Sequence, residues 1–460
     1  MNTSSDDENL KRKTMRVSIA EGSFGVFSSM LSDNYIVPFA LFLNSSPLQI
    51  GILSSLGNLI SPLGQIIGSR RIEKKTRKSI LMTGIIGMGA TWPLYLILVL
   101  LTFLEFLHLV LPWILIGFFL LYMMFSGIMN PPWFSVMGDV VPENSRGRYF
   151  AKRNLITNAI ALIGILSLSF FLDWFKALGI VFFGFILIFI FGFFSRGISA
   201  YLFTKHYYPP FDFERKDHIK FSTMIKEIPK SNFGRFTLFV SLLTLGQWIA
   251  GPFFSVYMLS DLGFDYSIFI MVNVSSSIIA LFIFPVLGKL SDKFGNVRLL
   301  QIGAIIIPFL PILWIFFDTP LGLILGPQLL GGIGWTSFNL AASNFIYDNI
   351  AGKMRGTYIA FYNFILGISI LIGGIAGGFI ITYVPIIFMN RFHFIFLISG
   401  IVRIVIVILM LPMIKEVRVT TKPVFNLKNL SIYKWLFDLT LRNHNKNKNL
   451  KKNLKNKNSN

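Results

Sequence analysis

The sequence contains no cysteine, which excludes disulfide frameworks, thiolate metal sites and cysteine nucleophiles. Charge is also scarce, because only 14% of the 460 residues are Asp, Glu, Lys or Arg, with 21 acidic residues against 42 basic ones. The sequence has no Walker A phosphate loop, G-x-S-x-G elbow or H-E-x-x-H helix, and no clustered His, Asp or Glu spacing that indicates a metal site. We therefore expect neither an enzyme nor a protein with a cofactor.

Hydrophobic residues, in contrast, make up 54% of the chain, and the mean hydropathy is +0.66. Such a composition exceeds what the core of a soluble protein needs. Apolar runs of about 20 residues, the length that spans a bilayer, recur along the chain and predict an all-α membrane protein with twelve transmembrane helices. The expected spans are 18–43, 46–68, 79–104, 110–137, 154–172, 178–203, 236–260, 266–288, 299–317, 320–345, 356–382 and 392–414.

The basic residues set the expected topology. When the twelve spans are counted, all but four of the 42 Lys and Arg residues fall on one side of the membrane. By the positive-inside rule that side is the cytoplasm, and an even number of helices leaves both termini there. Lys176 and Arg391 fall on the other side, while Arg196 and Arg403 fall within helices, where we expect them to snorkel to the interface. We therefore predict a multi-pass protein of the cell membrane whose basic charge reflects topology rather than nucleic-acid binding.

An internal repeat divides the chain into two halves. Residues 130–154 align with residues 339–363 at a constant offset, and most of the shared residues are polar, so common hydrophobicity does not explain the match. The identities are Asn130/Asn339, Asp139/Asp348, Arg146/Arg355, Gly147/Gly356, Tyr149/Tyr358, Ala151/Ala360 and Asn154/Asn363. The first and seventh spans also match. In the first span Asp33-Asn34 is followed by Pro38-Phe39, and in the seventh Gln247-Trp248 is followed by Pro252-Phe253. The sequence therefore predicts two parallel six-helix repeats.

The repeat and the charge pattern together predict the domain organisation. We expect an N-terminal six-helix bundle over residues 1–204, a cytoplasmic linker over 205–235 and a C-terminal bundle over 236–414. Residues 415–460 form a basic tail that ends in an Asn/Lys tract too polar to bury a core, so we expect part of it to be disordered.

A short loop motif carries a family resemblance. The string GKLSDKFGNVR, Gly288 to Arg298, resembles the loop motif G-x-L-x-D-[RK]-x-G-x-[RK]-[RK] of the major facilitator superfamily. The corresponding loop of the first half, GSRRIEKKTRKS, is a degraded copy in which Glu73 takes the acidic place and the glycine positions are lost. NPPWFSVMGDVVPENSRGRYFAKRN, EGSFGVF and PLQIGILSSL resemble a prokaryotic branch of the same superfamily. The resemblance covers roughly residues 16–416 and implies two six-helix bundles that rock about a central site.

The charged loop residues suggest a gate at the cytoplasmic face. Contacts of Asp292 with Arg355, and of Glu73 with Arg146, would lock the two halves together and break when the carrier opens inward. The alternative is that these charges stay hydrated and only set the topology, since loop charges contribute little on their own. The predicted gate comprises Glu73, Asp139, Arg146, Gly288, Asp292, Gly295, Asp348 and Arg355.

Polar residues inside the spans are the candidates for a substrate site, because burying them in a membrane is costly. Asp33 lies near the middle of the first span, and Pro38 removes a backbone bond to the Asn34 carbonyl, so we expect a broken turn there. The family resemblance places the first, fourth, seventh and tenth helices around the cavity. The candidates on these helices are Asp33, Asn34, Asn130, Trp133, Gln247, Trp248, Trp335 and Asn339.

These features favour a secondary active transporter that moves a small solute by alternating access. The alternative is a non-transporting membrane protein on the same fold, acting as an assembly factor or receptor. The aromatic share of 15% favours an amphiphilic substrate over a polyanion. Asp33 would either carry a coupling proton or bind a cationic group of the substrate, and we expect a monomer in contact with membrane lipids.

Overall fold

The computed structural model describes residues 3–72, 74–103, 107–142, 145–210, 231–350, 355–385 and 389–416. These residues form helices joined by short turns, with no strand among them. The predicted linker residues 211–230 and the tail beyond residue 416 lie outside this described part, so the expected domain boundaries stay predictions.

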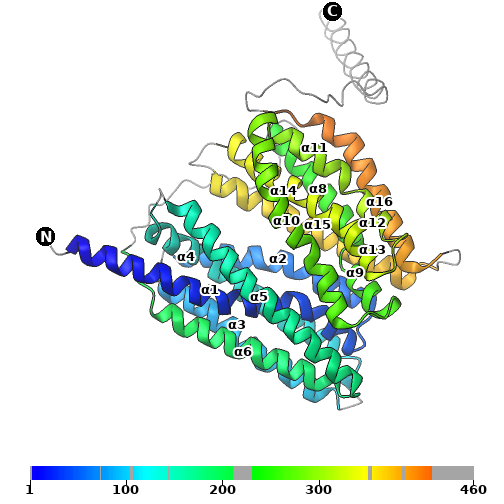
Figure 1. The fold of residues 1–460 in the computed structure, drawn as a ribbon, viewed down its shortest axis with the longest axis horizontal. Coiled ribbons are helices and arrows are strands. Elements are labelled where there is room, and N and C mark those ends of the chain that lie inside the picture. The colour runs from blue at the N-terminus through cyan, green and yellow to red at the C-terminus, as the bar shows by residue number, and fades with distance from the viewer. Residues whose placement is uncertain are drawn as a thin grey trace, which may run out of the picture.

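The first half contains six long helices (Figure 1). They are α1 (Thr3–Phe42), α2 (Pro47–Arg71), α3 (Arg77–Leu101), α4 (Leu111–Val140), α5 (Arg146–Ala177) and α6 (Val181–Thr204). Helices α1 and α5 begin well before the predicted spans, because their polar N-terminal residues continue the helix beyond the apolar run. The N-cap Ser46 forms a capping box with Gln49 and so sets the start of α2.

The second half repeats this arrangement with more interruptions. Its elements are α8 (Asn232–Ala250), α9 (Phe253–Val256), η3 (Tyr257–Asp261), α10 (Tyr266–Phe294), α11 (Asn296–Ile306), α12 (Phe309–Leu313), α13 (Pro320–Leu323), η4 (Ile324–Gln328), α14 (Leu329–Asn349), α15 (Arg355–Tyr383), α16 (Arg391–Met410) and η5 (Leu411–Met413). The breaks after α8 and α11 coincide with Pro252 and Pro308, which cannot donate a backbone hydrogen bond. Between α10 and α11 the chain turns at Gly295, whose φ of 88° favours glycine.

Ten helical segments of the described chain are long and apolar enough to cross a membrane. Two further segments, α1 and the continuous stretch from α13 to α14, pack into the two bundles beside them. Helix α1 contacts α5 and α6, and α14 contacts α10 and α11. The predicted all-α fold of twelve helices in two halves is confirmed.

The two bundles join at one end, which we call the closed end. There the backbone N–H groups of Tyr266 and Ser267 on α10 donate to the carboxylate of Asp173 on α5, at 2.6 and 2.9 Å. Lys176 pairs with Asp265 at 3.0 Å across the same junction. These contacts hold α5 against α10.

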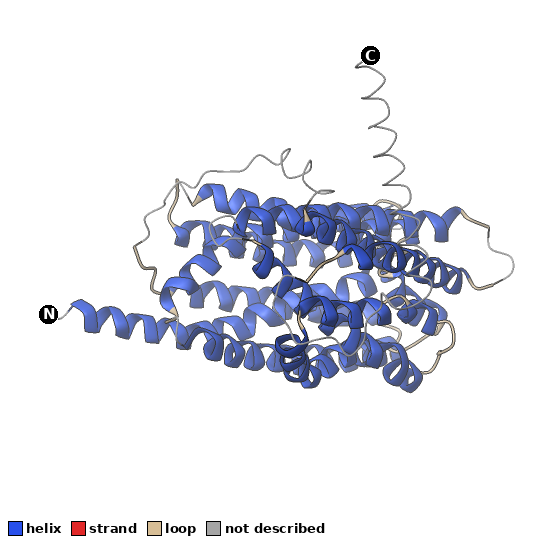
Figure 2. Ribbon diagram, turned by 90° about the horizontal axis from the view of Figure 1, so that it is seen from above, coloured by secondary structure: helices blue, strands red, loops and turns tan. Residues whose placement is uncertain are grey.

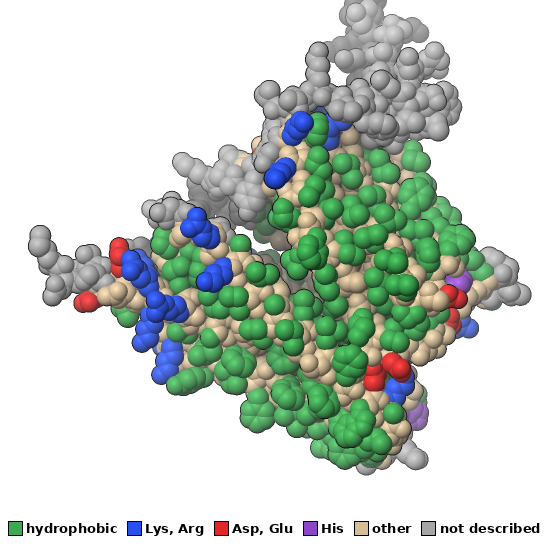
Figure 3. Space-filling view, in the orientation of Figure 1, with side chains coloured by type: hydrophobic (Ala, Val, Ile, Leu, Met, Phe, Trp, Pro, Cys, Tyr) green, Lys and Arg blue, Asp and Glu red, His purple; other side chains and the backbone are tan. Residues whose placement is uncertain are grey.

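Helices α2 and α15 form a second junction between the halves. They approach closely because Gly51 and Gly374 face each other without side chains, and a methyl group added at Gly374 would lie 2.6 Å from Ser55 Cβ. From these junctions the bundles diverge toward the upper left of Figure 1, which we call the open end. Figure 2 shows the same helices from above, with the N-terminal part of α1 projecting beyond the bundle. In Figure 3 the surface is hollowed between the halves, and most of the visible Lys and Arg side chains lie toward the open end.

Candidate functional site

The face of α1 that is turned toward the other half carries Asp33. Asp33, Val37 and Leu41 follow one another at four-residue spacing and therefore share a helix face. Leu41 lines a cavity together with Val256 of the second half, so this face looks across the gap between the bundles. The Asp33 side chain is exposed, although the residues around it on α1 are buried or half-buried. A carboxylate of the first half thus reaches open space between the halves.

The backbone around Asp33 differs from the prediction in one respect. The broken turn expected at Pro38 is wrong, because α1 continues as one helix from Thr3 to Phe42 with Pro38 inside it. The Asn34 side chain folds back along α1, where its Nδ2 donates to the Met30 carbonyl of the preceding turn at 2.9 Å.

Arg196 of α6 is the basic residue beside Asp33. Its side chain is buried, and its Nη2 donates to the Gly25 carbonyl, Ser29 Oγ and Tyr122 Oη at 3.2, 2.9 and 3.3 Å. The Arg196 charge also acts electrostatically on Asp33. The expectation that Arg196 snorkels to the interface is therefore wrong, because polar groups of α1 and α4 bind its Nη2 inside the bundle.

A buried ion pair lies on the open-end side of Arg196. Arg153 of α5 approaches Glu21 of α1 at 3.4 Å, and both side chains are less than a tenth exposed. Ser199 donates to Glu21 Oε1 at 3.1 Å, and Arg153 Nε donates to the Ser18 carbonyl and hydroxyl at 3.2 and 3.1 Å. The ring of Trp133 lies 4.9 Å from the Arg153 guanidinium, so this predicted substrate residue covers the ion pair.

The sequence does not reveal this pair, because Arg153 lies in a basic stretch on the predicted cytoplasmic side and Glu21 lies 132 residues before it, in the first span. The available signal was a carboxylate within the first apolar span, flanked by Gly22 and Gly25, which leave room for guanidinium groups. The side chain of Arg153 lies close enough to Gly22 that an added methyl group would overlap it.

His206 follows α6 at the edge of this cluster. Its ring is only 6% exposed and packs against Phe203 and Tyr208. Burial, together with the Arg153 charge, lowers the pKa of His206 to about 4. His206 is therefore neutral at physiological pH and adds no charge beside the ion pair.

The second half contributes amide and indole side chains. Gln247, Trp248 and Trp335 are half-buried, and Asn339 is exposed. Trp335 packs edge to face against Phe338, which anchors its ring in the second bundle. Asn130 of the first half is half-buried. Within the described chain no hydrogen bond joins any two of the eight predicted substrate residues.

Arg403 of α16 is the counterpart of Arg196, but it contacts carbonyl groups instead of side chains. Its Nη2 donates to the Gln247 carbonyl at 3.3 Å and its Nη1 to the Ile307 carbonyl at 3.1 Å. Pro311 cannot donate the helical bond that the Ile307 carbonyl would otherwise accept, so the guanidinium takes that place. Arg403 is 2% exposed, and the expectation that it snorkels is wrong for the same reason as for Arg196.

Some of the predicted gate residues lie in the described part of the chain. The hydrogen bonds and the ion pair found for them join residues of the same half. Asp139 pairs with Arg77 at 2.5 Å, and Arg146 Nη2 donates to the Gly138 carbonyl at 2.8 Å. Arg77, which is not among the predicted gate residues, also donates through its Nη2 to the Pro209 carbonyl at 2.6 Å.

The second half has a similar contact at the same end. Asp348 accepts a bond of 2.5 Å from Asn296 Nδ2, and Asn296 Oδ1 in turn accepts from Ser291 at 2.6 Å. Gly288 lies in the last turns of α10, and Gly295 ends that helix. Glu73 and the side chains of Asp292 and Arg355 lie outside the described part, so the proposed contacts of the gate stay predictions.

Among the residues that the structure describes, no three His, Cys, Asp or Glu side chains are grouped so that they could hold a metal ion. The arrangement instead offers one exposed carboxylate, buried cations behind it, and amides and indoles on the opposite bundle. Such a site has the groups to bind a small polar or amphiphilic solute between the two bundles.

Comparison with known proteins supports this interpretation of the fold. A family model described as Major Facilitator Superfamily matches the sequence twice, over residues 22–245 and 236–437. A search of curated proteins finds no match.

Several solved structures share the fold. A mutant of the nucleoside transporter NupG has a TM-score of 0.68 at 12% identity, covering 88% of this chain and 100% of that one. A bacterial homologue of the iron transporter ferroportin, in an inward-facing state, has a TM-score of 0.65 at 14% identity, covering 89% and 99%. The POT family transporter PepTSo also has a TM-score of 0.65 at 14% identity, covering 86% and 96%.

Proposed function

The chain belongs to the major facilitator superfamily, and from this premise we propose that it is a secondary active transporter that moves a small solute by alternating access. The observation that carries the proposal is the exposed carboxylate of Asp33 on the face between two bundles that join at one end and diverge at the other. A polar group is costly to keep at this depth of a membrane unless it is used.

We further propose that the structure represents the inward-open state. The closed end carries the loop after α1 and the turn after α5, which the charge pattern assigns to the outside. The open end carries the N-terminus and the basic turns, which the same pattern assigns to the cytoplasm. The likeness to an inward-facing ferroportin homologue supports this assignment.

The orientation can be tested by labelling, because the chain has no cysteine of its own. Single cysteines at Ser45 and Lys176 are expected to react with a membrane-impermeant maleimide in intact cells, whereas cysteines at Lys74 and Lys216 react only after the membrane is opened. Strong labelling of Lys216→Cys in intact cells would contradict both the orientation and the even number of helices.

Transport itself separates the proposal from its alternative, an assembly factor or receptor on the same fold. A thermal-shift screen of the purified protein against small amphiphilic solutes would identify a ligand. Proteoliposomes are loaded with the unlabelled ligand, and the labelled ligand is added outside. We expect the labelled ligand to enter in exchange for the unlabelled one, whereas protein-free liposomes should take up none. A ligand that raises the melting temperature but never crosses the membrane would favour the receptor.

A further inference from the structure

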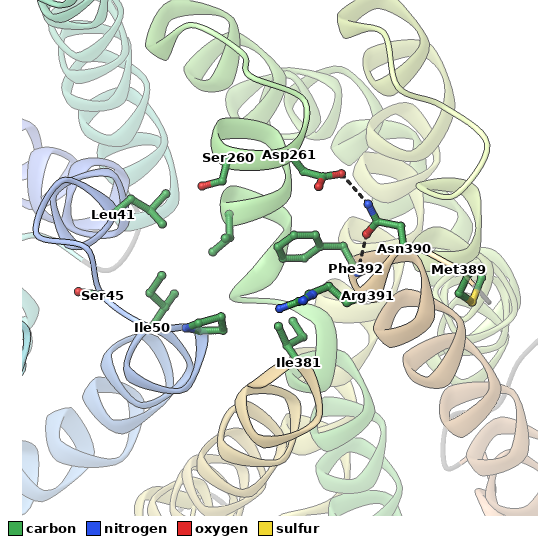
Figure 4. A pocket seen from close by; sticks show the side chains of 12 residues that line it. Leu41, Ser45, Ile50, Ser260, Asp261, Ile381, Met389, Asn390, Arg391 and Phe392 are labelled. Atoms are coloured by element: carbon green, nitrogen blue, oxygen red, sulfur yellow. Dashed lines mark hydrogen bonds between the residues drawn. The ribbon is translucent and has the colours of Figure 1, made fainter. Parts of the chain in front are cut away.

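The cavity that Leu41 and Val256 line is at the closed end, and none of the eight predicted substrate residues is among its lining residues. Its volume is about 550 Å³, which is large enough for a small organic molecule. Figure 4 shows that the first half forms one wall and the second half the other. The lining residues are Leu41, Ser45, Pro47, Ile50, Val256, Ser260, Asp261, Ile381, Met389, Asn390, Arg391 and Phe392.

The cavity combines apolar walls with one cation. Leu41, Pro47 and Met389 are half-buried and offer apolar surface to the body of a ligand. The Arg391 side chain extends into the cavity in Figure 4. In the described chain the guanidinium of Arg391 has no hydrogen-bond or ion-pair partner. A guanidinium beside apolar walls is a strong binding group for a planar anion such as a carboxylate.

The acidic residue of the cavity is already engaged. Asp261 accepts a hydrogen bond from Asn390 Nδ2 at 2.9 Å, and Asn390 Oδ1 in turn accepts from the Phe392 N–H at 2.8 Å. Asp261 therefore helps to hold the loop that presents Arg391, and its negative charge disfavours a ligand with more than one anionic group. A ligand with a single carboxylate avoids most of this repulsion.

We propose that this cavity binds a small monocarboxylate with an apolar or aromatic body, with the carboxylate on Arg391 and the body against Leu41 and Pro47. Because both halves line the cavity, the bound monocarboxylate stabilises the state in which this end is closed. The site does not depend on the transport activity proposed above, so binding can be tested directly.

The test uses the full-length protein in lipid nanodiscs, with phenylacetate as the probe and phenylacetamide as its neutral analogue. We expect calorimetry to show that phenylacetate binds at least about tenfold more tightly than phenylacetamide, because only the acid forms a charge-assisted bond with Arg391. Arg391→Gln should remove that difference, and Lys152→Gln, a control that removes an exposed cation of the first half far from the cavity, should preserve it.

Two outcomes would overturn the proposal. Equal affinities of the wild-type protein for the acid and the amide would show that Arg391 does not select an anion, and this comparison requires no variant to fold. Tighter binding of benzylamine than of phenylacetate would show that Asp261, rather than Arg391, selects the ligand. Neither result would bear on transport, which is measured separately with the solute found by screening.

Discussion

Replacing Arg153 by methionine is expected to lower the free energy of unfolding by about 3–5 kcal/mol, the usual cost of leaving one buried charge without its partner. Methionine fills much of the arginine volume but cannot bond to Glu21 or Ser18. The carboxylate of Glu21 would then stay buried between α1, α5 and α6 with only the Ser199 hydroxyl as a direct partner. The loss should appear as a lower melting temperature of the purified protein.

Two further variants make this result specific. Glu21→Gln combined with Arg153→Met removes both charges, so the double variant should regain most of the lost stability. Lys152→Met changes the neighbouring residue, whose side chain is exposed, and should stay within about 0.5 kcal/mol of the wild type. A double variant less stable than Arg153→Met would mean that the polar contacts with Ser18 matter more than the ion pair.

The global fold could be predicted from the sequence because bilayer thickness and the cost of moving charge across it act on every helix separately. Twenty apolar residues make a span wherever they occur, and the repeat of Asp139 and Arg146 at Asp348 and Arg355 is visible without any coordinates. The breaks at Pro252 and Pro308 also follow from local chemistry. Pro38 does not break α1 because a proline inside a membrane helix is tolerated where neighbouring helices support the backbone.

The partners of the charged residues could not be predicted in this way. Glu21 and Arg153 are separated by 132 residues, and they meet only because α1 packs against α5. A charge near the end of an apolar span looks the same in the sequence whether it snorkels or pairs inside the bundle. Arg196 and Arg403 show the difference, since each is buried and is held by groups of other helices.

Asp33→Asn is expected to reduce transport driven by a proton gradient by about a hundredfold or more, while exchange at equal concentrations on both sides continues. Asparagine keeps the size and hydrogen-bonding capacity of the side chain but cannot exchange a proton, and the loss of an essential proton-transfer group costs about this much. The prediction rests on the exposure of Asp33 between the bundles and on the charge of Arg196 behind it. Both activities can be measured in the same proteoliposomes with and without a pH gradient.

The comparison of the two activities decides which role Asp33 has. A carboxylate that is neutral in one access state and ionised in the other couples proton movement to solute movement, so only gradient-driven transport needs the acid. If Asp33→Asn also abolishes exchange, the residue binds a cationic group of the solute. If both activities survive, Asp33 has a structural role and the site lies elsewhere. Asp318→Asn makes the same chemical change at an exposed position between α12 and α13, and it should leave both activities unchanged.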